Sequence, residues 1–319
     1  MSAPVHPDDR AADPAVEIDG LVMRYGEKVA VDGLSLEVER ASITAVLGPN
    51  GAGKTTTLET AEGYRTPQAG TVRVLGLDPV RERRDLLPRI GVMLQGGGAW
   101  SGVHADEMLR HVARLHAHPL DLPALSDRLG LGECGRTPYR RLSGGQQQRL
   151  GLALAIVGRP EIVFVDEPTA GMDPAARRTT WELLEELRAS GVTVVLTTHY
   201  MDEAERLADR IHIIDHGRLI ASGTPLELTR GGTSTIRLVV TKPFPDNAPD
   251  SLRAALGAGM ELTQLGSTSL LLTGPADAST LAVVSHWCEE NDVLPESLTL
   301  GQRTLEDAFL ELTGRELTG

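Results

Sequence analysis

The segment SITAVLGPNGAGKTTTLETAEGY, residues 42–64, decides the fold of this 319-residue chain. Its first part runs into a continuously apolar stretch, as expected for a buried central strand. The loop Gly48–Thr55 follows with three glycines, and residues 54–64 are expected to form a helix. A strand, a glycine-rich loop and a helix in this order predict a parallel sheet covered by helices.

The loop Gly48–Thr55 fits the phosphate-binding pattern G-x4-G-K-[ST]. Glycines let such a loop curl until its N–H groups face phosphate oxygens, and the positive end of the next helix adds to that field. Lys54 is expected to reach the β- and γ-phosphates, and Thr55 to offer its hydroxyl to Mg²⁺. Only three of the 31 Lys and Arg residues are lysines, which argues against a chance glycine loop. The sequence therefore predicts a site for ATP and Mg²⁺.

A second apolar strand, EIVFVDEP at 161–168, places two carboxylates at its carboxyl end, where ligands of parallel sheets gather. Asp166 is expected to hold Mg²⁺ through its water shell. Glu167 is positioned as a general base for the attacking water. The alternative, an acidic surface turn, fits this strand less well once the loop at Gly48–Thr55 is considered.

The motif Leu142–Gln146, LSGGQ, directly precedes another predicted helix. A serine followed by two glycines is a helix-capping arrangement, and simple capping is one interpretation. The same geometry also makes a second anion site from Ser143 and the glycine amides. One domain has no evident need for two γ-phosphate sites, so this motif requires a further explanation.

The remaining chain divides into a tail and two domains. Residues 1–15 are predicted to be a disordered tail, 16–230 a nucleotide-binding domain and 231–319 a smaller α+β domain, with a hinge at 230–236. The pattern of the first domain is a β region from 16 to 48, strands at 71–76 and 90–95, a mostly helical region at 103–158, and strand–helix alternation that closes with a β pair at 211–223. The order βαββαβ plus a final helix predicts a ferredoxin-like second domain.

Composition narrows the functional classes. A formal charge of −13 argues against a non-specific nucleic-acid binder or a protein held on anionic lipid by charge. With only 3% aromatic residues, the cores should consist mostly of Leu, Val, Ile and Ala. Cys134 and Cys288 have no CxxC spacing and suggest neither a disulfide framework nor a metal site. The N-terminus lacks a signal-peptide pattern and no run approaches about 20 apolar residues, so we expect a cytosolic protein.

Taken in order, the phosphate-binding loop, LSGGQ, VDEP and a lone His199 after a strand resemble the nucleotide-binding domain of ABC ATPases over residues 16–225. The resemblance implies an α/β P-loop NTPase fold with a RecA-like core, an antiparallel β region and a helical subdomain. It also implies that Tyr25 stacks on adenine, that Gln95 is the Q-loop glutamine, and that Gly171–Asp173 forms the D-loop. His199 corresponds to the switch histidine that contacts the γ-phosphate.

The resemblance assigns a full set of site residues. Catalytic roles fall to Glu167, His199 and Gln95, and metal contacts to Thr55, Gln95 and Asp166. Nucleotide contacts are assigned to Tyr25, Gly48, Pro49, Asn50, Gly51, Ala52, Gly53, Lys54, Thr55, Thr56, Ser143, Gly144, Gly145, Gln146 and Asp173. Such domains dimerise head to tail, so that Ser143 of one subunit closes on ATP held by Lys54 of the other. A homodimer is the simpler interpretation, because both half-sites are intact in this chain.

Three classes of ABC protein compete: the ATPase subunit of an exporter, a soluble protein of translation or DNA maintenance, and an importer ATPase. One nucleotide domain, no heptad array and a negative charge disfavour the second class. The C-terminal order ending in LEDAFLELTGRE resembles the accessory domain of the daunorubicin-resistance branch, although an unrelated regulatory domain is the alternative. The resemblance implies an exporter of drugs, lipids or polysaccharides, with a separate membrane permease that holds this chain at the inner face of the membrane and with no nucleic-acid partner.

The segment Gln95–Trp100 departs from the family by its run of glycines. The resemblance implies that this segment faces the membrane subunit. Trp100 is either a docking residue for that subunit, since aromatic residues are enriched at interfaces, or a cap on the core of the helical region.

Overall fold

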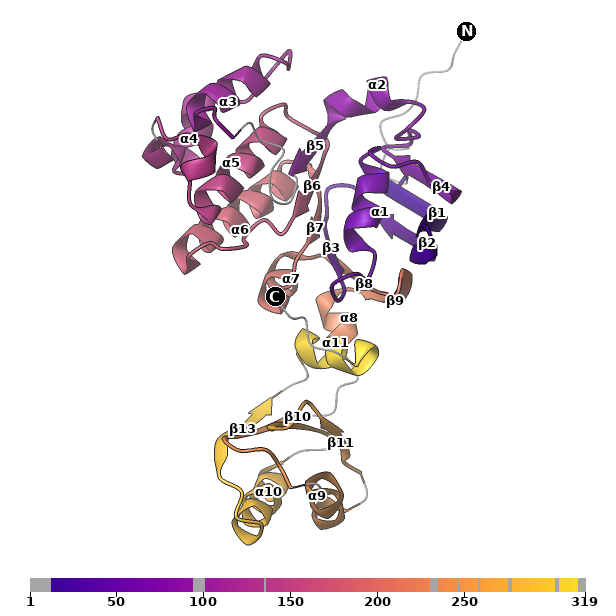
Figure 1. Cartoon of the computed structure of the whole chain (residues 1–319), viewed down its shortest axis with the longest axis vertical. Coiled ribbons are helices and arrows are strands. Elements are labelled where there is room, and N and C mark those ends of the chain that lie inside the picture. The colour runs from indigo at the N-terminus through magenta and orange to yellow at the C-terminus, as the bar shows by residue number, and fades with distance from the viewer. Residues whose placement is uncertain are drawn as a thin grey trace. The chain divides into compact units, whose positions relative to one another are not determined.

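The protein is described by a computed structural model over residues 13–93, 101–134, 136–229, 235–245, 247–257, 259–274, 277–301 and 304–314. Contacts divide the chain into two compact units. The first comprises Met1–Pro225 with Leu312–Gly319, and the second Leu226–Glu311. Figure 1 labels the helices and strands of both.

The first unit is built on a six-stranded sheet with the order β5-β6-β7-β3-β8-β9. All its strands are parallel except β9, which pairs antiparallel with β8. The strands are β3 (Ile43–Leu47), β5 (Ile90–Met93), β6 (Ile162–Asp166), β7 (Thr193–Thr197), β8 (Arg210–Asp215) and β9 (Arg218–Gly223). In β3 and β7 every residue is buried, which agrees with the apolar runs of the sequence.

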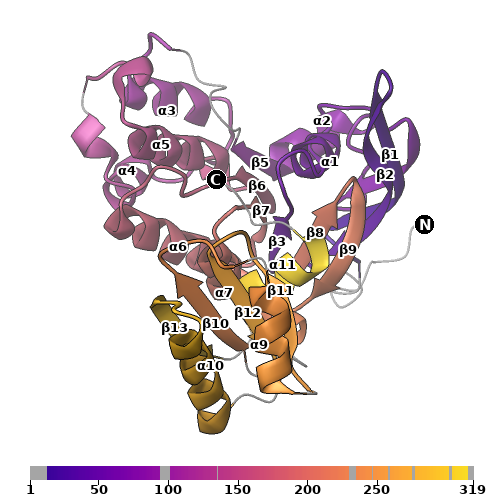
Figure 2. The ribbon, with the colours of Figure 1, turned by 60° about the horizontal axis from the view of Figure 1, so that its bottom comes forward.

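A second, antiparallel sheet in this unit has the order β2-β1-β4 and is formed by β1 (Val16–Tyr25), β2 (Lys28–Val38) and β4 (Ala69–Val74). Helix α1 (Lys54–Ala61) lies beside it (Figures 1 and 2). One hydrophobic core contains residues of this sheet, Leu58 and Ala61 of α1, and Phe164 of β6. The helix after the glycine-rich loop is therefore anchored to both sheets by burial of its apolar side chains.

Helices account for the rest of the first unit. Figure 1 shows α3, α4 and α5 gathered on the side of the central sheet away from β1, β2 and β4. The helices are α2 (Arg83–Leu86), α3 (Ala105–Ala113), α4 (Leu122–Arg128), α5 (Gly144–Ile156), α6 (Pro174–Ala189) and α7 (Met201–Leu207), with 3-10 turns η2 (Leu87–Arg89), η3 (Leu131–Cys134) and η4 (Tyr139–Arg141). Helix α8 (Pro225–Thr229) begins at the last residue of the stretch Met1–Pro225 and belongs otherwise to the second unit. The predicted helical region thus forms a subdomain between β5 and β6.

The second unit contains a four-stranded antiparallel sheet of order β11-β12-β10-β13, which is the ferredoxin-like order expected for βαββαβ. Its elements are β10 (Thr235–Val240), α9 (Ala248–Leu256), β11 (Glu261–Gln264), β12 (Ser269–Thr273), α10 (Ala278–Glu290), β13 (Pro295–Gly301) and α11 (Leu305–Thr313). Helices α9 and α10 cover one face of the sheet (Figure 1). Leu252 and Trp287 from these helices share a core with Leu238 and Leu270 of the strands.

Three predicted boundaries differ from the structure. Ala15, expected in the disordered tail, is buried and its N–H donates to Val38 O over 2.7 Å. Thr235, expected in the hinge, already belongs to β10, and the predicted boundary at 230 lies outside the described residues. Helix α5, predicted to follow the LSGGQ motif, begins within it at Gly144 because Ser143 caps the helix. In each case a backbone hydrogen bond or a cap continues the regular structure into a segment of polar or small residues.

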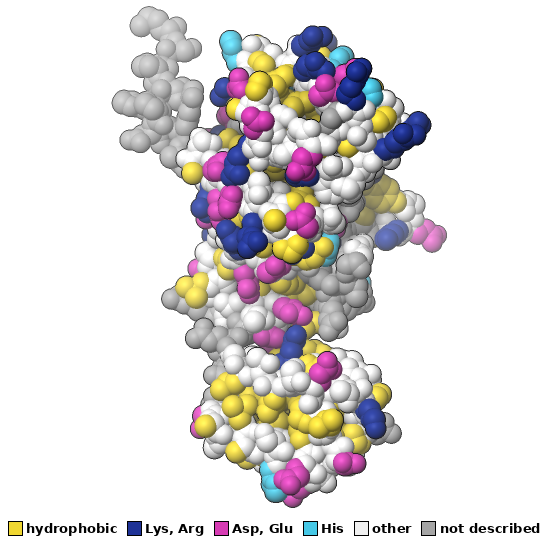
Figure 3. Space-filling model, turned by 90° about the vertical axis from the view of Figure 1, so that its left-hand side faces the viewer, with side chains coloured by type: hydrophobic (Ala, Val, Ile, Leu, Met, Phe, Trp, Pro, Cys, Tyr) yellow, Lys and Arg dark blue, Asp and Glu magenta, His cyan; other side chains and the backbone are white. Residues whose placement is uncertain are grey.

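The surface carries charges of both signs. Over the face of the first unit seen in Figure 3, basic and acidic side chains are interspersed. Cys134 and Cys288 are free and buried. Within the described ranges, no helix has the length and apolar character needed to cross a membrane.

Candidate active site

The parallel register of the central sheet brings three predicted segments to one edge. Thr197 at the end of β7 pairs with Val46 of β3 on one side and with Asp166 of β6 on the other. The loop Gly48–Thr55, the pair Asp166–Glu167 and the segment around His199 therefore all leave the sheet at the same edge. Side chains that are distant in sequence meet there because parallel strands end together.

The loop Gly48–Thr55 has a backbone that only glycine adopts readily. Gly51 and Gly53 have φ angles of +83° and +105°, and Gly53 immediately precedes α1. A Cβ added at Gly53 would lie 2.5 Å from Ala30 O, and one added at Gly48 would lie 2.2 Å from Ile214 O. The glycines are thus required both by φ and by the close approach of neighbouring backbone.

Lys54 is folded back onto this loop. Its Nζ donates to Gly48 O at 2.6 Å and to Pro49 O at 3.2 Å. Burial lowers the pKa of Lys54, and the nearby carboxylates of Glu167 and Asp166 oppose that change. The ammonium group is therefore held at the mouth of the loop beside two acids, where a polyphosphate would replace the carbonyl groups as its partner.

A cavity of about 220 Å³ opens over the loop. It brings together most of the residues predicted to contact nucleotide with the two acids of β6. Its lining is Tyr25, Lys28, Ala30, Asn50, Gly51, Ala52, Gly53, Lys54, Thr55, Thr56, Asp166 and Glu167. Tyr25 is 42% exposed, and the Arg65 guanidinium lies 5.1 Å from its ring centroid, so one face of the ring already stacks with a cation.

Asp166 is held from β7. The Thr197 hydroxyl donates to its Oδ1, and Thr197 itself is fully buried. Burial raises the pKa of Asp166, the Thr197 hydrogen bond lowers it, and the charge of Glu167 raises it again. A carboxylate that is desolvated and lies near a second acid is stabilised by a cation.

Glu167 adopts a left-handed backbone with φ of +51°. Its N–H donates to Thr197 O at 3.0 Å, which fixes the residue beside the end of β7. Its Oε1 lies 3.4 Å from His199 Nδ1. A non-glycine residue in this conformation costs about 1–3 kcal/mol, a strain that is typical of functional sites.

Ser143 and Asp173 cap helices in this chain. Ser143 Oγ accepts from Gln146 N at 3.3 Å, while Gln146 Oε1 accepts from Ser143 N at 3.0 Å. Asp173 caps α6, and the N–H groups of Ala176 and Ala175 lower its pKa. A Cβ added at Gly145 would lie 3.5 Å from Met172 Cγ, so the LSGGQ motif and the predicted D-loop are neighbours. Among the described residues that line the cavity, Ser143–Gln146 and Asp173 do not occur.

The donors around the cavity fit a magnesium ion. Thr55 and Asp166 both line it and offer a hydroxyl and a carboxylate, the hard oxygen ligands that Mg²⁺ prefers. No group of three or more His, Cys, Asp or Glu residues suited to a metal occurs in the described part of the chain. A cation held by few protein ligands and completed by phosphate is the usual arrangement for Mg²⁺. Gln95, the third predicted metal ligand, and Trp100 lie outside the described residues.

Two acids near the site were not predicted from the sequence. Glu62 follows α1, is only 5% exposed, and its Oε2 has no hydrogen-bond partner in the described structure. Glu203 on α7 is fully buried. Both lie in predicted helices that contain other charged residues, where a solvent-facing position is the natural expectation, so no local pattern indicates their burial.

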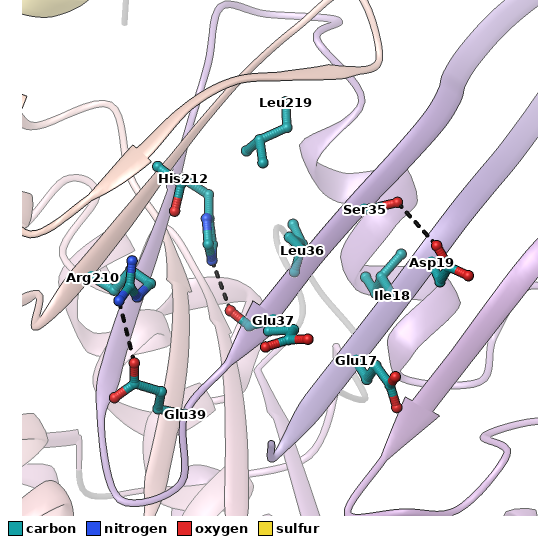
Figure 4. A pocket seen from close by; sticks show the side chains of 11 residues that line it. Glu17, Ile18, Asp19, Ser35, Leu36, Glu37, Glu39, Arg210, His212 and Leu219 are labelled. Carbon is teal, nitrogen blue, oxygen red and sulfur yellow. Dashed lines mark hydrogen bonds and ion pairs between the residues drawn. The ribbon is translucent and has the colours of Figure 1, made fainter. Parts of the chain in front are cut away.

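A second cavity, of about 490 Å³, lies between the antiparallel sheet and β8 (Figure 4). His212 Nε2 lies 2.9 Å from Glu37 O, and Arg210 Nη2 lies 3.3 Å from Glu39 Oε1. These contacts join β8 to the end of β2 and to Glu39, which follows it. It contains none of the predicted site residues, and its interactions support the packing of the two sheets.

Comparison with known proteins gives consistent relatives. The profile of the family described as ABC transporter matches residues 31–170. The daunorubicin resistance ATP-binding protein DrrA3 of Streptomyces coeruleorubidus is 38% identical over 317 residues, covering 95% of this chain and 97% of that protein. The Nod factor export ATP-binding protein I of Ralstonia nicotianae is 37% identical over 310 residues, covering 95% of each.

Solved structures share the fold. One described as the ATP-binding subunit of an ABC transporter gives a TM-score of 0.63 at 26% identity and covers 68% of this chain and 92% of that chain. The protein cbiO1 of Clostridium perfringens, part of the ABC transporter complex cbiONQ, gives 0.60 at 26% identity and covers 69% of this chain and 92% of its own.

Replacement of Gly53 by alanine is expected to weaken ATP binding more than about tenfold, because the new Cβ would meet Ala30 O and the required φ would be strained. Calorimetric titration with ATP measures the effect. Gly132→Ala is the matched control, since an added Cβ there meets nothing within 4 Å and no positive φ is required. Equal affinities in the two variants would contradict this account of the loop.

Glu62 should make stability depend on pH. Burial, with Asp166 and then Glu59 adding to it, raises the pKa of Glu62 from 4.5 to about 8. The folded protein therefore holds a proton that the unfolded chain releases in this window, so the free energy of unfolding falls as pH rises, by at most about 1.4 kcal/mol per pH unit. Glu62→Gln should remove this contribution in urea unfolding at several pH values. Glu17→Gln, at an exposed position, is the control. If the free energy of unfolding of Glu62→Gln fell with pH as steeply as that of the wild type, the raised pKa of Glu62 would be refuted.

Proposed function

Because the chain belongs to the ATP-binding proteins of ABC transporters, we propose that it is the ATP-hydrolysing subunit of an exporter and drives a separate membrane permease. The chain binds and hydrolyses ATP, the activity of this family. The observation that supports the assigned site best is the meeting of Lys54, Asp166 and Glu167 in one cavity above the glycine-rich loop.

The cavity suits hydrolysis of the terminal phosphate. The loop amides and Lys54 hold the triphosphate, and the ring of Tyr25 stacks on the base. Thr55 and Asp166 would hold Mg²⁺, which would supply positive charge to offset that of the phosphate oxygens. Glu167 takes the proton of a water whose oxygen attacks the γ-phosphorus, while the bond from that phosphorus to the bridging oxygen of ADP breaks.

His199 is proposed to act beside Glu167. With its Nδ1 at 3.4 Å from Glu167 Oε1, the imidazole orients the carboxylate toward the attacking water and presents its other edge to the γ-phosphate. Gln95 lies outside the described residues, and its role beside the metal and the water stays a prediction. Together, Glu167, His199 and Gln95 would position the attacking water rather than the phosphate.

The LSGGQ motif is proposed to complete the site of a second subunit. Ser143 and the amides of Gly144 and Gly145 stand at the start of the 13-residue helix α5, whose positive end favours an anion. Since they line no part of their own chain's cavity in the described structure, their anion would come from a partner copy. Asp173, close to this motif through its neighbour Met172, would lie at the same interface. A homodimer remains the simpler arrangement, and ATP would act as the bridge between its subunits.

The transport direction and the class of cargo are proposed from the names of the relatives. Those relatives are named for daunorubicin resistance and for Nod factor export, and the sequence predicts an exporter of drugs, lipids or polysaccharides. We propose export of a compound of such a class, with this subunit at the inner face of the membrane through its permease. The second unit, Leu226–Glu311 in the structure and predicted as a domain at 231–319, would be the accessory domain of this branch.

Glu167→Gln should lower ATP hydrolysis by about 10²–10⁴-fold while ATP binding is retained, because the general base is lost and the phosphate contacts remain. Steady-state phosphate release and ATP titration measure the two effects, and size-exclusion chromatography in ATP should show a dimer. The exposed Glu261→Gln serves as control. Wild-type hydrolysis by Glu167→Gln, or a specific activity independent of concentration with no dimer in ATP, would contradict the proposal.

A further inference from the structure

Glu203 is a buried acid that the chemistry above does not use. It lies on α7, four positions after His199, and is fully buried. Its Oε1 accepts a hydrogen bond from Thr169 Oγ1 at 2.9 Å and another from Trp181 Nε1 at 2.8 Å. Both donors meet at Oε1, while Oε2 is buried without a hydrogen-bond partner in the described structure. A buried carboxylate is costly to place, so the two donors at Oε1 are needed to hold it and are fixed by it in turn.

Each partner of Glu203 belongs to a segment that carries a proposed catalytic or interface residue. Thr169 stands two residues after Glu167. Trp181 lies on α6, the helix that Asp173 caps. The hydroxyl of Thr198, next to His199, also acts on the carboxyl group, since it lowers the pKa of Glu203 against the larger effect of burial.

The contacts around Glu203 explain how a strained backbone is kept. Glu167 has φ of +51°, and the strand hydrogen bond from its N–H to Thr197 O fixes only the side that precedes it. On the side that follows, Thr169 is fully buried and tied to Glu203. The left-handed conformation of Glu167 is thus held from both ends, and one of those ends is Glu203.

A parallel set of contacts joins α6 to the segment that carries His199. Arg177 lies 4.1 Å from the ring centroid of Tyr200 and forms an ion pair with Asp202 at 3.6 Å. The Tyr200 ring in turn lies 4.0 Å from that of His199. Arg177 and Trp181 are one turn apart on α6, so they lie on the same side of this helix. That side contacts Tyr200 and Asp202 through Arg177, and Glu203 through Trp181.

We propose that Glu203 is a positioning residue for ATP hydrolysis, whose carboxylate fixes the segments of Glu167 and His199 relative to each other through Thr169 and Trp181. It does not line the cavity over the loop Gly48–Thr55 and acts only through these neighbours. The inference rests on the catalytic roles proposed for Glu167 and His199. Its effect should fall on the rate of the chemical step and leave the binding of ATP to the loop Gly48–Thr55 intact.

The test uses the whole 319-residue chain and measures kcat, KM for ATP and thermal stability. Glu203→Leu should lower kcat at least about tenfold with KM changed less than about threefold, because the P-loop is not touched. Glu203→Gln should restore most of kcat, since its Oε1 can still accept from Thr169 and Trp181. Thr169→Val, which keeps the carboxylate but cuts its link to the segment of Glu167, should lower kcat by several-fold and serves if Glu203→Leu does not fold.

Leu34→Ala is the control for stability, because Leu34 is a core residue of β2 and a large-to-small change there destabilises the same unit. It should leave kcat unchanged at temperatures where the protein is folded. The inference is overturned if Glu203→Leu keeps wild-type kcat, if Leu34→Ala loses as much kcat, or if Glu203→Gln is as impaired as Glu203→Leu. Glu167→Gln distinguishes failure of the proposed function from failure of this inference. Full activity of Glu167→Gln would refute the catalytic role of Glu167. An inactive Glu167→Gln together with a fully active Glu203→Leu would refute the role of Glu203 alone.

Discussion

The parallel register of β3, β7 and β6 is the constraint on which the site depends. It places Thr197 between Val46 and Asp166, so that the phosphate-binding loop, the two acids and the segment of His199 leave one edge of the sheet together. Thr197 then acts twice, since its hydroxyl holds Asp166 and its carbonyl holds the N–H of Glu167. A shift of one residue in this register would turn these side chains to the other face of the sheet.

Local sequence patterns predict those parts of the site whose structure depends on residues close together in the sequence. The glycines of the loop Gly48–Thr55 were predictable because φ and close backbone contact at Gly53 demand them. The acids at the end of β6 were predictable because a buried strand ends there. The strand order of the second unit followed from the order of its elements, since βαββαβ has few ways to form one sheet.

The remaining parts depend on packing between distant segments. Glu203 stands in a charged helical sequence, MDEAERLADR, and only the approach of Thr169 and Trp181 makes it a buried hydrogen-bond acceptor. The distance between Glu167 and His199 likewise depends on the register of two strands. The Pro-, Asp- and Ala-rich composition around Ala15 predicts a disordered tail, yet the hydrogen bond from Ala15 N–H to Val38 O extends the sheet region. None of these outcomes has a local signature.

In the proposed dimer each ATP site is shared between two subunits, with Lys54 from one and Ser143 from the other. The most direct measurement mixes two separately inactive variants, Lys54→Ala and Ser143→Arg, and follows ATP hydrolysis. In a two-fold symmetric dimer the mixed species has one intact site of two, so an equimolar mixture should recover up to about a quarter of wild-type activity. Activity no greater than the sum of the two separate variants, with both folded, would contradict the claim.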